Sequence, residues 1–137
     1  MNAAGVLLDT GPLVALLSRN DANHERARRM FADCTPPFRT CESVVAEACF
    51  LLGRIHRDGP SDLVSLGARG LYTIGIAAEA HWASIESLLK KYADRPISLA
   101  DACLIRCAEI HGEGRIATFD ADFSIYRWRR NRRFELL

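Results

Sequence analysis

The sequence lacks the features of a membrane, secreted or fibrous protein. No apolar run in its 137 residues approaches the ~18–20 residues that cross a bilayer. No basic leader precedes the first apolar run, so a secretory signal is not expected either. Repeats, low-complexity stretches and linkers are also missing. With 49% hydrophobic and 26% charged residues, the composition is that of a globular protein, and we expect one domain over residues 1–137.

Cysteine pairs with the spacing of a zinc site are missing as well. No Cys-x-x-Cys pair occurs among the cysteines Cys34, Cys41, Cys49, Cys103 and Cys107. Cys103 and Cys107 lie four residues apart, a spacing that places two neighbours on one helix face but leaves a zinc ion two ligands short. We therefore predict small buried hydrophobic residues in a protein of the reducing cytoplasm.

Lysine is scarce, with two lysines against 16 arginines. The formal charge is +1, but residues 1–126 carry 13 basic and 16 acidic side chains, whereas residues 127–137 carry five arginines and one acid. Arginine forms bidentate contacts with phosphate, so the basic end suggests a polyanionic partner. A solvated tail, with an arginine content set by genome base composition, explains the same pattern.

Short apolar strands alternate with helical segments along the chain. Strands are predicted at 5–9, 38–40, 71–76, 115–118 and, as a final edge strand, 134–137. Helices are predicted at 13–18, 22–31, 43–57, 61–68, 77–92, 98–111 and 120–126. The core candidates of the 43–57 helix are Val44, Val45, Ala48, Phe50, Leu51, Leu52 and Ile55. This alternation predicts an α/β domain with a mostly parallel sheet and right-handed crossovers.

Four acidic residues fall where this topology predicts the carboxyl edge of the sheet. Asp9 ends the first strand, and Asp120 follows the 115–118 strand by two residues. Glu47 and Asp101 lie early in helices that begin at the same edge. Since ligands of such sheets bind beyond the carboxyl ends of the strands, we expect four carboxylates on one rim.

Each acid also has a purely structural alternative. Asp9 could cap the helix that follows it. Asp101 lies three residues after a serine, as in a capping box, although its helical neighbours are apolar and an unpaired buried charge is costly. Glu47 lies on a stripe that could simply face solvent, and Asp120 or Asp122 could cap the next helix.

A cluster of carboxylates requires protons or a cation. Two carboxylates about 5 Å apart repel by roughly 3 kcal/mol at an effective dielectric constant of about 20. The repulsion is relieved if pKa values rise or if a divalent ion binds. Ligation by oxygen alone favours Mg²⁺, or Mn²⁺, over Zn²⁺, and such an ion orients water against a phosphodiester. The hydroxyls of Thr10 and Thr118 could tune the site through hydrogen bonds.

Four segments resemble, in order, the motifs of the PIN-domain nucleases. They are Val6-Leu7-Leu8-Asp9-Thr10-Gly11-Pro12-Leu13, Ser43-Val44-Val45-Ala46-Glu47, Ser98-Leu99-Ala100-Asp101-Ala102 and Ala117-Thr118-Phe119-Asp120-Ala121-Asp122-Phe123. Their order and spacing cover nearly the whole chain, whose short length resembles the VapC-type toxins of prokaryotic toxin–antitoxin pairs. The resemblance implies a PIN-like three-layer domain with a central sheet of four to five strands flanked by helices.

The resemblance also implies a Mg²⁺-dependent endoribonuclease that leaves a 3′-hydroxyl and a 5′-phosphate. Asp9 and Asp101 would be the main metal ligands, and Asp120 would bind the metal or hold a metal-bound water. Glu47 would position or deprotonate the attacking water. Asp122 matches an accessory acid of the family.

Partners follow from the same resemblance. The family usually works as a homodimer, inhibited by a small antitoxin whose C-terminal segment crosses the active-site groove. In an RNA-binding enzyme, Arg127, Arg129 and Arg130 could contact phosphates, or an arginine could pair with an antitoxin carboxylate. Trp128 could stack on a base or pack against the body or a second subunit.

Two other functions fit parts of the sequence. One is a catalytically inactive PIN-like module that binds RNA or protein, although the acidic set is complete. The other uses Asp9 as a phosphoacceptor, but phosphatases of that kind place a second acid two residues later, where this chain has Gly11.

Overall fold

The computed structural model describes residues 5–137. Residues 1–4 lie outside the described residues. They include the start of the predicted domain and the positions at which a basic leader was not expected. One sheet contains β3 (Tyr72–Ile74), β2 (Phe38–Thr40), β1 (Leu7–Leu8), β4 (Arg115–Ala117) and β7 (Glu135–Leu136), in that spatial order. All four strand pairs are parallel, which confirms the predicted α/β sheet and its final edge strand.

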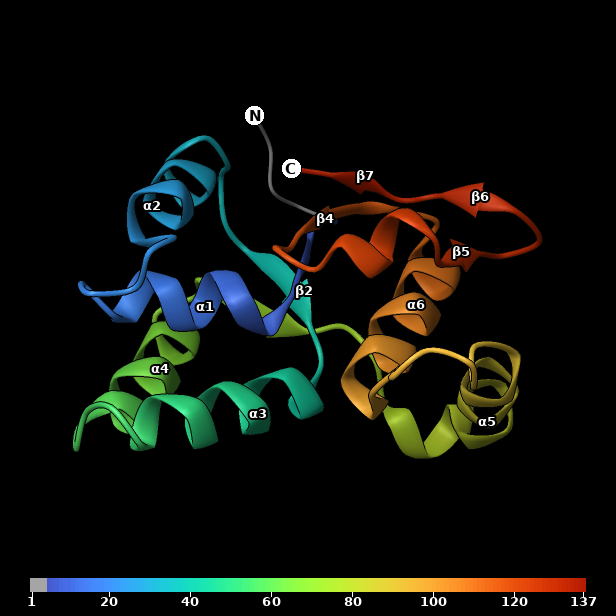
Figure 1. The fold of residues 1–137 in the computed structure, drawn as a ribbon, viewed down its shortest axis with the longest axis horizontal. Coiled ribbons are helices and arrows are strands. Elements are labelled where there is room, and N and C mark those ends of the chain that lie inside the picture. The colour runs from blue at the N-terminus through green and yellow to red at the C-terminus, as the bar shows by residue number, and fades with distance from the viewer. Residues whose placement is uncertain (1–4) are drawn as a thin grey trace.

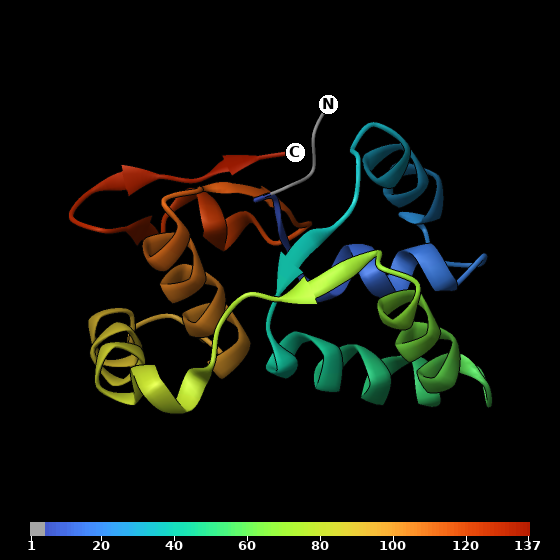
Figure 2. The ribbon, with the colours of Figure 1, turned by 180° about the vertical axis from the view of Figure 1, so that it is seen from behind.

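Helices cover the sheet on both sides. They are α1 (Thr10–Leu17), α2 (His24–Ala32), α3 (Glu42–Gly53), α4 (Gly59–Ala68), α5 (Trp82–Lys91) and α6 (Leu99–His111), with short 3₁₀ helices η1 (Ala78–His81) and η2 (Ala121–Ser124). Figures 1 and 2 show α1 to α4 on one side of the sheet and α5 and α6 on the other. This is the three-layer arrangement that the resemblance predicts.

The strand order changes direction beside β1. From β1 the chain moves outward to β2 and β3, and then returns through α5 and α6 to β4 on the other side of β1. In open α/β sheets such a switch point leaves a crevice beyond the carboxyl ends of the two central strands. Asp9 follows β1 directly and Thr118 follows β4 directly, so both lie at this crevice.

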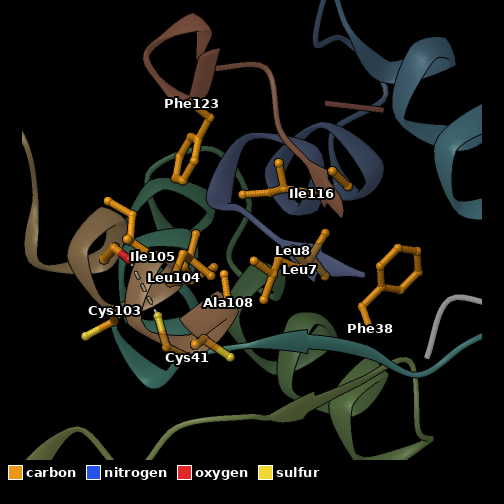
Figure 3. Close-up of a cluster of buried hydrophobic side chains, with 14 of the residues drawn as sticks. Leu7, Leu8, Phe38, Cys41, Cys103, Leu104, Ile105, Ala108, Ile116 and Phe123 are labelled. Atoms are coloured by element: carbon orange, nitrogen blue, oxygen red, sulfur yellow. Dashed lines mark hydrogen bonds between the residues drawn. The ribbon is translucent and has the colours of Figure 1, made fainter. Parts of the chain in front are cut away.

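The core is continuous across the sheet. Leu7 and Leu8 of β1, Ile116 of β4 and Leu104 of α6 are completely buried and belong to one hydrophobic cluster, which Figure 3 shows. A strand buried on both faces reads as an unbroken apolar run, which is the pattern at the start of this chain. Strands β1 and β4 are shorter than predicted, and each ends directly before a polar residue of the sheet edge, Asp9 and Thr118 respectively.

The prediction for the core face of α3 was partly wrong. Val44, Ala48 and Leu52, spaced four residues apart, are fully buried, but Phe50 is 65% exposed and Ile55 is 56% exposed. Leu51 is also exposed, at 37%. A helix lying against one layer buries a single stripe, so apolar residues outside the stripe remain at the surface. The helix also ends at Gly53, four residues earlier than predicted.

Two other predicted helices are altered. The predicted 77–92 helix begins with a turn of 3₁₀ helix, η1, and becomes α-helical at Trp82, a tightening that is common at helix N-termini. The predicted 120–126 helix is the single 3₁₀ turn η2. The hairpin of β5 (Arg127–Trp128) and β6 (Arg132–Arg133) was not predicted.

The cysteine prediction is largely confirmed. Cys34, Cys41, Cys103 and Cys107 are buried, Cys49 is partly buried, and all five are free thiols. Figure 3 shows Cys41 and Cys103 within the apolar core. No helix within residues 5–137 is long and apolar enough to span a membrane.

Candidate active site

Asp9 is positioned by the end of β1 and the start of α1. Its backbone N–H donates to Ala117 O of β4 at 3.0 Å, which fixes the residue at the switch point. The carboxylate accepts hydrogen bonds from the Thr10 backbone N–H at 2.8 Å and from the Thr118 hydroxyl at 2.7 Å. Asp9 is 7% exposed. Asp9 therefore caps α1, as the structural alternative stated, and its role in a metal site stays a prediction.

Asp101 is held by the first turn of α6. Ser98 Oγ accepts from the Asp101 backbone N–H at 3.0 Å, and the Asp101 carboxylate accepts from the Ser98 backbone N–H at 3.3 Å. This is the predicted capping box. The hydroxyl of buried Tyr126 also donates to Asp101 Oδ2 at 3.3 Å, a contact that the sequence did not suggest.

Thr118 joins two of the acids. While its hydroxyl donates to Asp9, its oxygen accepts the Asp120 backbone N–H at 2.9 Å. Asp120 in turn accepts the Asp122 backbone N–H at 2.9 Å and so caps η2. Asp122 forms an ion pair with Arg95 at 3.5 Å. The predicted tuning role of the Thr118 hydroxyl thus has a direct geometric basis.

Glu47 reaches the site from α3. Its Oε2 accepts a hydrogen bond from the Thr10 hydroxyl at 2.8 Å, which links α3 to the start of α1. In contrast to Asp9 and Asp101, Glu47 is exposed. It therefore lies on the solvent-facing strip that the helical pattern allowed, and it also faces the other acids.

The four acids line one cleft of about 380 Å³. Its walls are formed by Asp9, Thr10, Gly11, Glu47, Pro96, Ser98, Asp101, Phe119 and Asp120. Four segments that are distant in sequence therefore meet at the switch point of the sheet. The sequence pointed to the acids and threonines, but Pro96 and Phe119 carried no sign of a site because one reads as a helix breaker and the other as a core residue.

The acids influence one another electrostatically. The pKa of Asp9 is raised to about 6, mainly by burial and also by the charges of Asp101 and Asp120, against the lowering effect of the Thr118 and Thr10 hydrogen bonds. Burial also raises the pKa of Asp101, with a further increase from the charge of Asp120. Three carboxylates therefore share one field, and a cation among them would relieve their repulsion.

The residues fit a hard divalent cation in chemistry, without a preformed metal cage. Among residues 5–137, no group of three or more Asp, Glu, His or Cys side chains is arranged closely enough to hold an ion as it stands. Each acid uses one or two oxygen lone pairs on neutral donors, and a carboxylate has about four such positions, so others are left for a ligand. The cleft is lined by oxygen donors without histidine or cysteine, which suits Mg²⁺ or Mn²⁺.

The predicted arginine contacts have other partners. The Arg127 guanidinium donates to three backbone carbonyls, those of Ser124, Ile125 and Tyr126. Arg129 binds Glu109 through its backbone N–H at 2.8 Å and through its guanidinium. Since Glu109 lies eight residues beyond Asp101 on α6, this contact is about 12 Å along the helix from the cleft.

Arg130 and Trp128 of the β5–β6 hairpin differ in their exposure to solvent. Arg130 is exposed, and its contact with RNA stays a prediction. Trp128 is only 6% exposed, and its indole N–H donates to Arg133 O at 3.1 Å. It therefore packs against the body, as one of the sequence alternatives stated, and little of its side chain is exposed.

Comparison with known proteins agrees with the fold and the motifs. A model of the PIN domain matches residues 6–128. No curated protein sequence matches the chain significantly. Among solved structures, VapC20 of Mycobacterium tuberculosis, a sarcin–ricin loop cleaving toxin, is 26% identical with a TM-score of 0.70, covering 88% of this chain and 93% of that chain.

VapBC2 from Rickettsia felis, bound to a DNA fragment from its promoter, has a TM-score of 0.62 and covers 99% of this chain and 98% of that chain. At 13% identity, this likeness shows the fold alone. The sequence match, by contrast, extends over all four acidic positions and nearly the whole described chain. The chain therefore belongs to the PIN-domain family.

Proposed function

We propose that this protein is a Mg²⁺-dependent endoribonuclease and the toxin of a VapBC-type toxin–antitoxin pair. The observation that carries the proposal is the cleft at the switch point, where Asp9, Glu47, Asp101 and Asp120 converge from four separate segments. Beyond the effect of burial, the charge of Asp120 raises the pKa of both Asp9 and Asp101, and the same negative field attracts a metal ion. The reaction is hydrolysis of an RNA phosphodiester.

The acids divide into ligands and a base. Asp9 and Asp101, both buried and fixed by neutral donors, would hold the ion, and Asp120 would bind it or orient a water beside it. When bound, Mg²⁺, or Mn²⁺ in its place, would lower the pKa of water and offset the charge that develops on the phosphate. Glu47 is exposed and held by Thr10, so it suits the positioning and deprotonation of the attacking water.

Partners are proposed from the similar structures and from the surface. The neighbours are a VapC toxin and a VapBC protein, which supports an antitoxin that occupies the cleft. Exposed apolar side chains occur on α3, α4 and β3, among them Phe50, Val64 and Ile74. Such a surface suits association with another chain, so we include a homodimer in the proposal. The free thiols are consistent with a cytoplasmic protein.

The proposal is tested by RNA cleavage in Asp101→Asn and Asp9→Asn. Each variant keeps the size of the side chain but removes a charge that the metal ion needs. Because each ligand supports the whole metal site, we expect the rate of RNA cleavage to fall by at least roughly a hundredfold. Asp94→Asn is the matched control, because Asp94 is exposed and does not line the cleft. Undiminished cleavage by purified Asp101→Asn, or cleavage that persists in EDTA, would refute the proposal.

An inactive interaction module is the alternative. Thermal melting with increasing Mg²⁺ separates the two, because a metal that binds only the folded protein raises the melting temperature. Stabilisation that disappears in Asp9→Asn supports a metal site, and no response to Mg²⁺ supports the module.

A further inference from the structure

One arginine outside the acidic set contacts a residue of the cleft wall. Arg26 lies on α2, which packs alongside α1 (Figure 1), and its guanidinium carbon lies 4.8 Å above the ring centre of Phe119. Phe119 lines the cleft and immediately precedes Asp120. The ring lies close to the backbone of Gly11, since a Cβ added there would come 3.2 Å from it. Arg26 is therefore positioned by a residue of the cleft wall.

A positive charge beside the cleft would reduce the repulsion between the acids of the cleft and the phosphates of an RNA strand. None of the cleft-lining residues within 5–137 is basic, and four of them are acids, so an RNA strand needs positive charge from the rim. Arg95 directly precedes Pro96 of the cleft wall but is paired with Asp122 at 3.5 Å. In the described part of the chain, no carboxylate lies within ion-pair distance of Arg26, whose side chain is exposed.

The stacking geometry determines what Arg26 can bind. A guanidinium stacked over an aromatic face satisfies no N–H group there and leaves the donors at its edge free. Those donors form a planar fork that fits two phosphate oxygens. The ring face under Arg26 is covered, so Phe119 serves to orient the arginine and does not stack on a base through that face.

We propose that Arg26, oriented by Phe119, binds a backbone phosphate of the RNA next to the scissile bond. The inference rests on the proposed nuclease function and adds a substrate-binding residue to it. Arg26 contacts the substrate, whereas Phe119 is a positioning residue. The chemistry recognised is the phosphate of a single strand, so binding through Arg26 is independent of base sequence.

The test measures RNA binding with Mg²⁺ present in a Glu47→Gln background, which keeps the proposed metal ligands and removes the proposed base, so that the RNA is not cut. The probe is a fluorescent single-stranded RNA of mixed sequence and about 12 nucleotides, a length within the usual span of single-strand sites. Fluorescence anisotropy gives Kd at several salt concentrations for Arg26→Gln, Arg26→Lys and Arg28→Gln. Arg28 is the matched control because it is exposed on the same helix and already paired with Glu25 at 3.1 Å.

We expect Arg26→Gln to weaken binding roughly tenfold, as for loss of a hydrogen bond to a charged group. The slope of log K against log salt should become shallower by about 0.7, the value for one phosphate of a single strand. Arg26→Lys should retain the slope but lose part of the affinity, since it keeps the charge without the fork. Arg28→Gln should match the parent in both quantities.

The outcomes separate this inference from the proposed function. If the parent does not bind RNA, both are overturned. If the parent binds and Arg26→Gln binds equally well, this inference alone fails, and the stacked pair serves packing or a protein partner. A purely structural role would lower the melting temperature of Arg26→Gln without changing the salt slope. Phe119→Leu supplies a second variant, expected to weaken binding while the slope stays that of the parent.

Discussion

At the scale of single residues, Asp9 connects stability with chemistry. Its carboxylate is one of the most buried charges of the cleft, and neutral donors from Thr10 and Thr118 hold it in place. These donors favour the ionised form, whereas burial and the neighbouring acids favour the protonated form. A bound cation would change this balance, because it replaces the proton as the partner of the negative charge.

The pKa of Asp9 predicts the pH dependence of the metal-free protein. It is raised to about 6 in the fold, above the value of about 3.9 in an unfolded chain. The folded state therefore binds this proton more tightly. The resulting stabilisation is complete below about pH 4 and is lost as the pH rises through about 6. A difference of two pKa units between the folded and unfolded states changes the free energy of unfolding by at most about 3 kcal/mol.

Asp9→Asn should abolish this dependence. In EDTA, we expect the variant to melt several degrees above the wild type at about pH 7, and to lose this advantage at about pH 4. Thermal melting across this range checks the expectation. A variant that melts below the wild type at neutral pH would show that the hydrogen bonds lost on substitution outweigh the relief of charge.

At the scale of elements, α3 presents two different faces. Leu52 is completely buried, whereas Phe50 is 65% exposed and stacks with Arg54, whose guanidinium carbon is 5.8 Å from the ring centre. Glu47 lies on the exposed side near Phe50, one turn away along the helix. The apolar surface beside Glu47 is thus available to a partner and contributes little to the fold.

Substituting alanine for Leu52 and for Phe50 should distinguish the buried face of α3 from its exposed face. We expect Leu52→Ala to lower the free energy of unfolding by about 2–5 kcal/mol, because it leaves a cavity in the core. Phe50→Ala should lower it by less than about 1 kcal/mol, the scale of an exposed cation–π contact. Urea denaturation followed by circular dichroism measures both. Equal losses would mean that Phe50 is covered in solution.

The elements differ in how far the sequence alone specifies them. The buried strands and the edge positions of Asp9 and Asp120 were predictable, because an apolar run followed by an acid marks the end of a strand in a parallel sheet. The exposed face of α3 was not, because apolar residues that serve a surface look the same in sequence as those of a core. The β5–β6 hairpin also escaped prediction because five of the seven residues from Arg127 to Arg133 are arginines, so the segment has no apolar run or alternation.

At the scale of the whole molecule, the site depends on contacts that no local pattern contains. Tyr126 reaches Asp101 from 25 residues away in sequence, and Thr118 reaches Asp9 from 109 residues away. Arg26 meets Phe119 through the packing of α2. The acids themselves could be predicted from their place in the topology, whereas their donors and rim cations require the folded structure.

The distribution of charge, too, could be predicted only in part from the sequence. The basic C-terminal segment suggested a polyanion site at that end of the chain, but Arg129 is bound to Glu109 at the far end of α6 from Asp101. The acids, by contrast, gather at the switch point, where they exclude a polyanion unless a cation intervenes. We therefore propose that the RNA binds at the cleft and that its binding depends on the metal ion.

The most direct test of this account is Mn²⁺ binding followed by electron paramagnetic resonance, in the absence of RNA. We predict that the wild-type protein binds Mn²⁺, that Mg²⁺ displaces it, and that Asp9→Asn and Asp101→Asn each weaken binding by about 10–100-fold, whereas Asp94→Asn does not. Binding that is equal in the wild type and both cleft variants, or absent from all of them, would contradict the claim that the four acids share a metal ion.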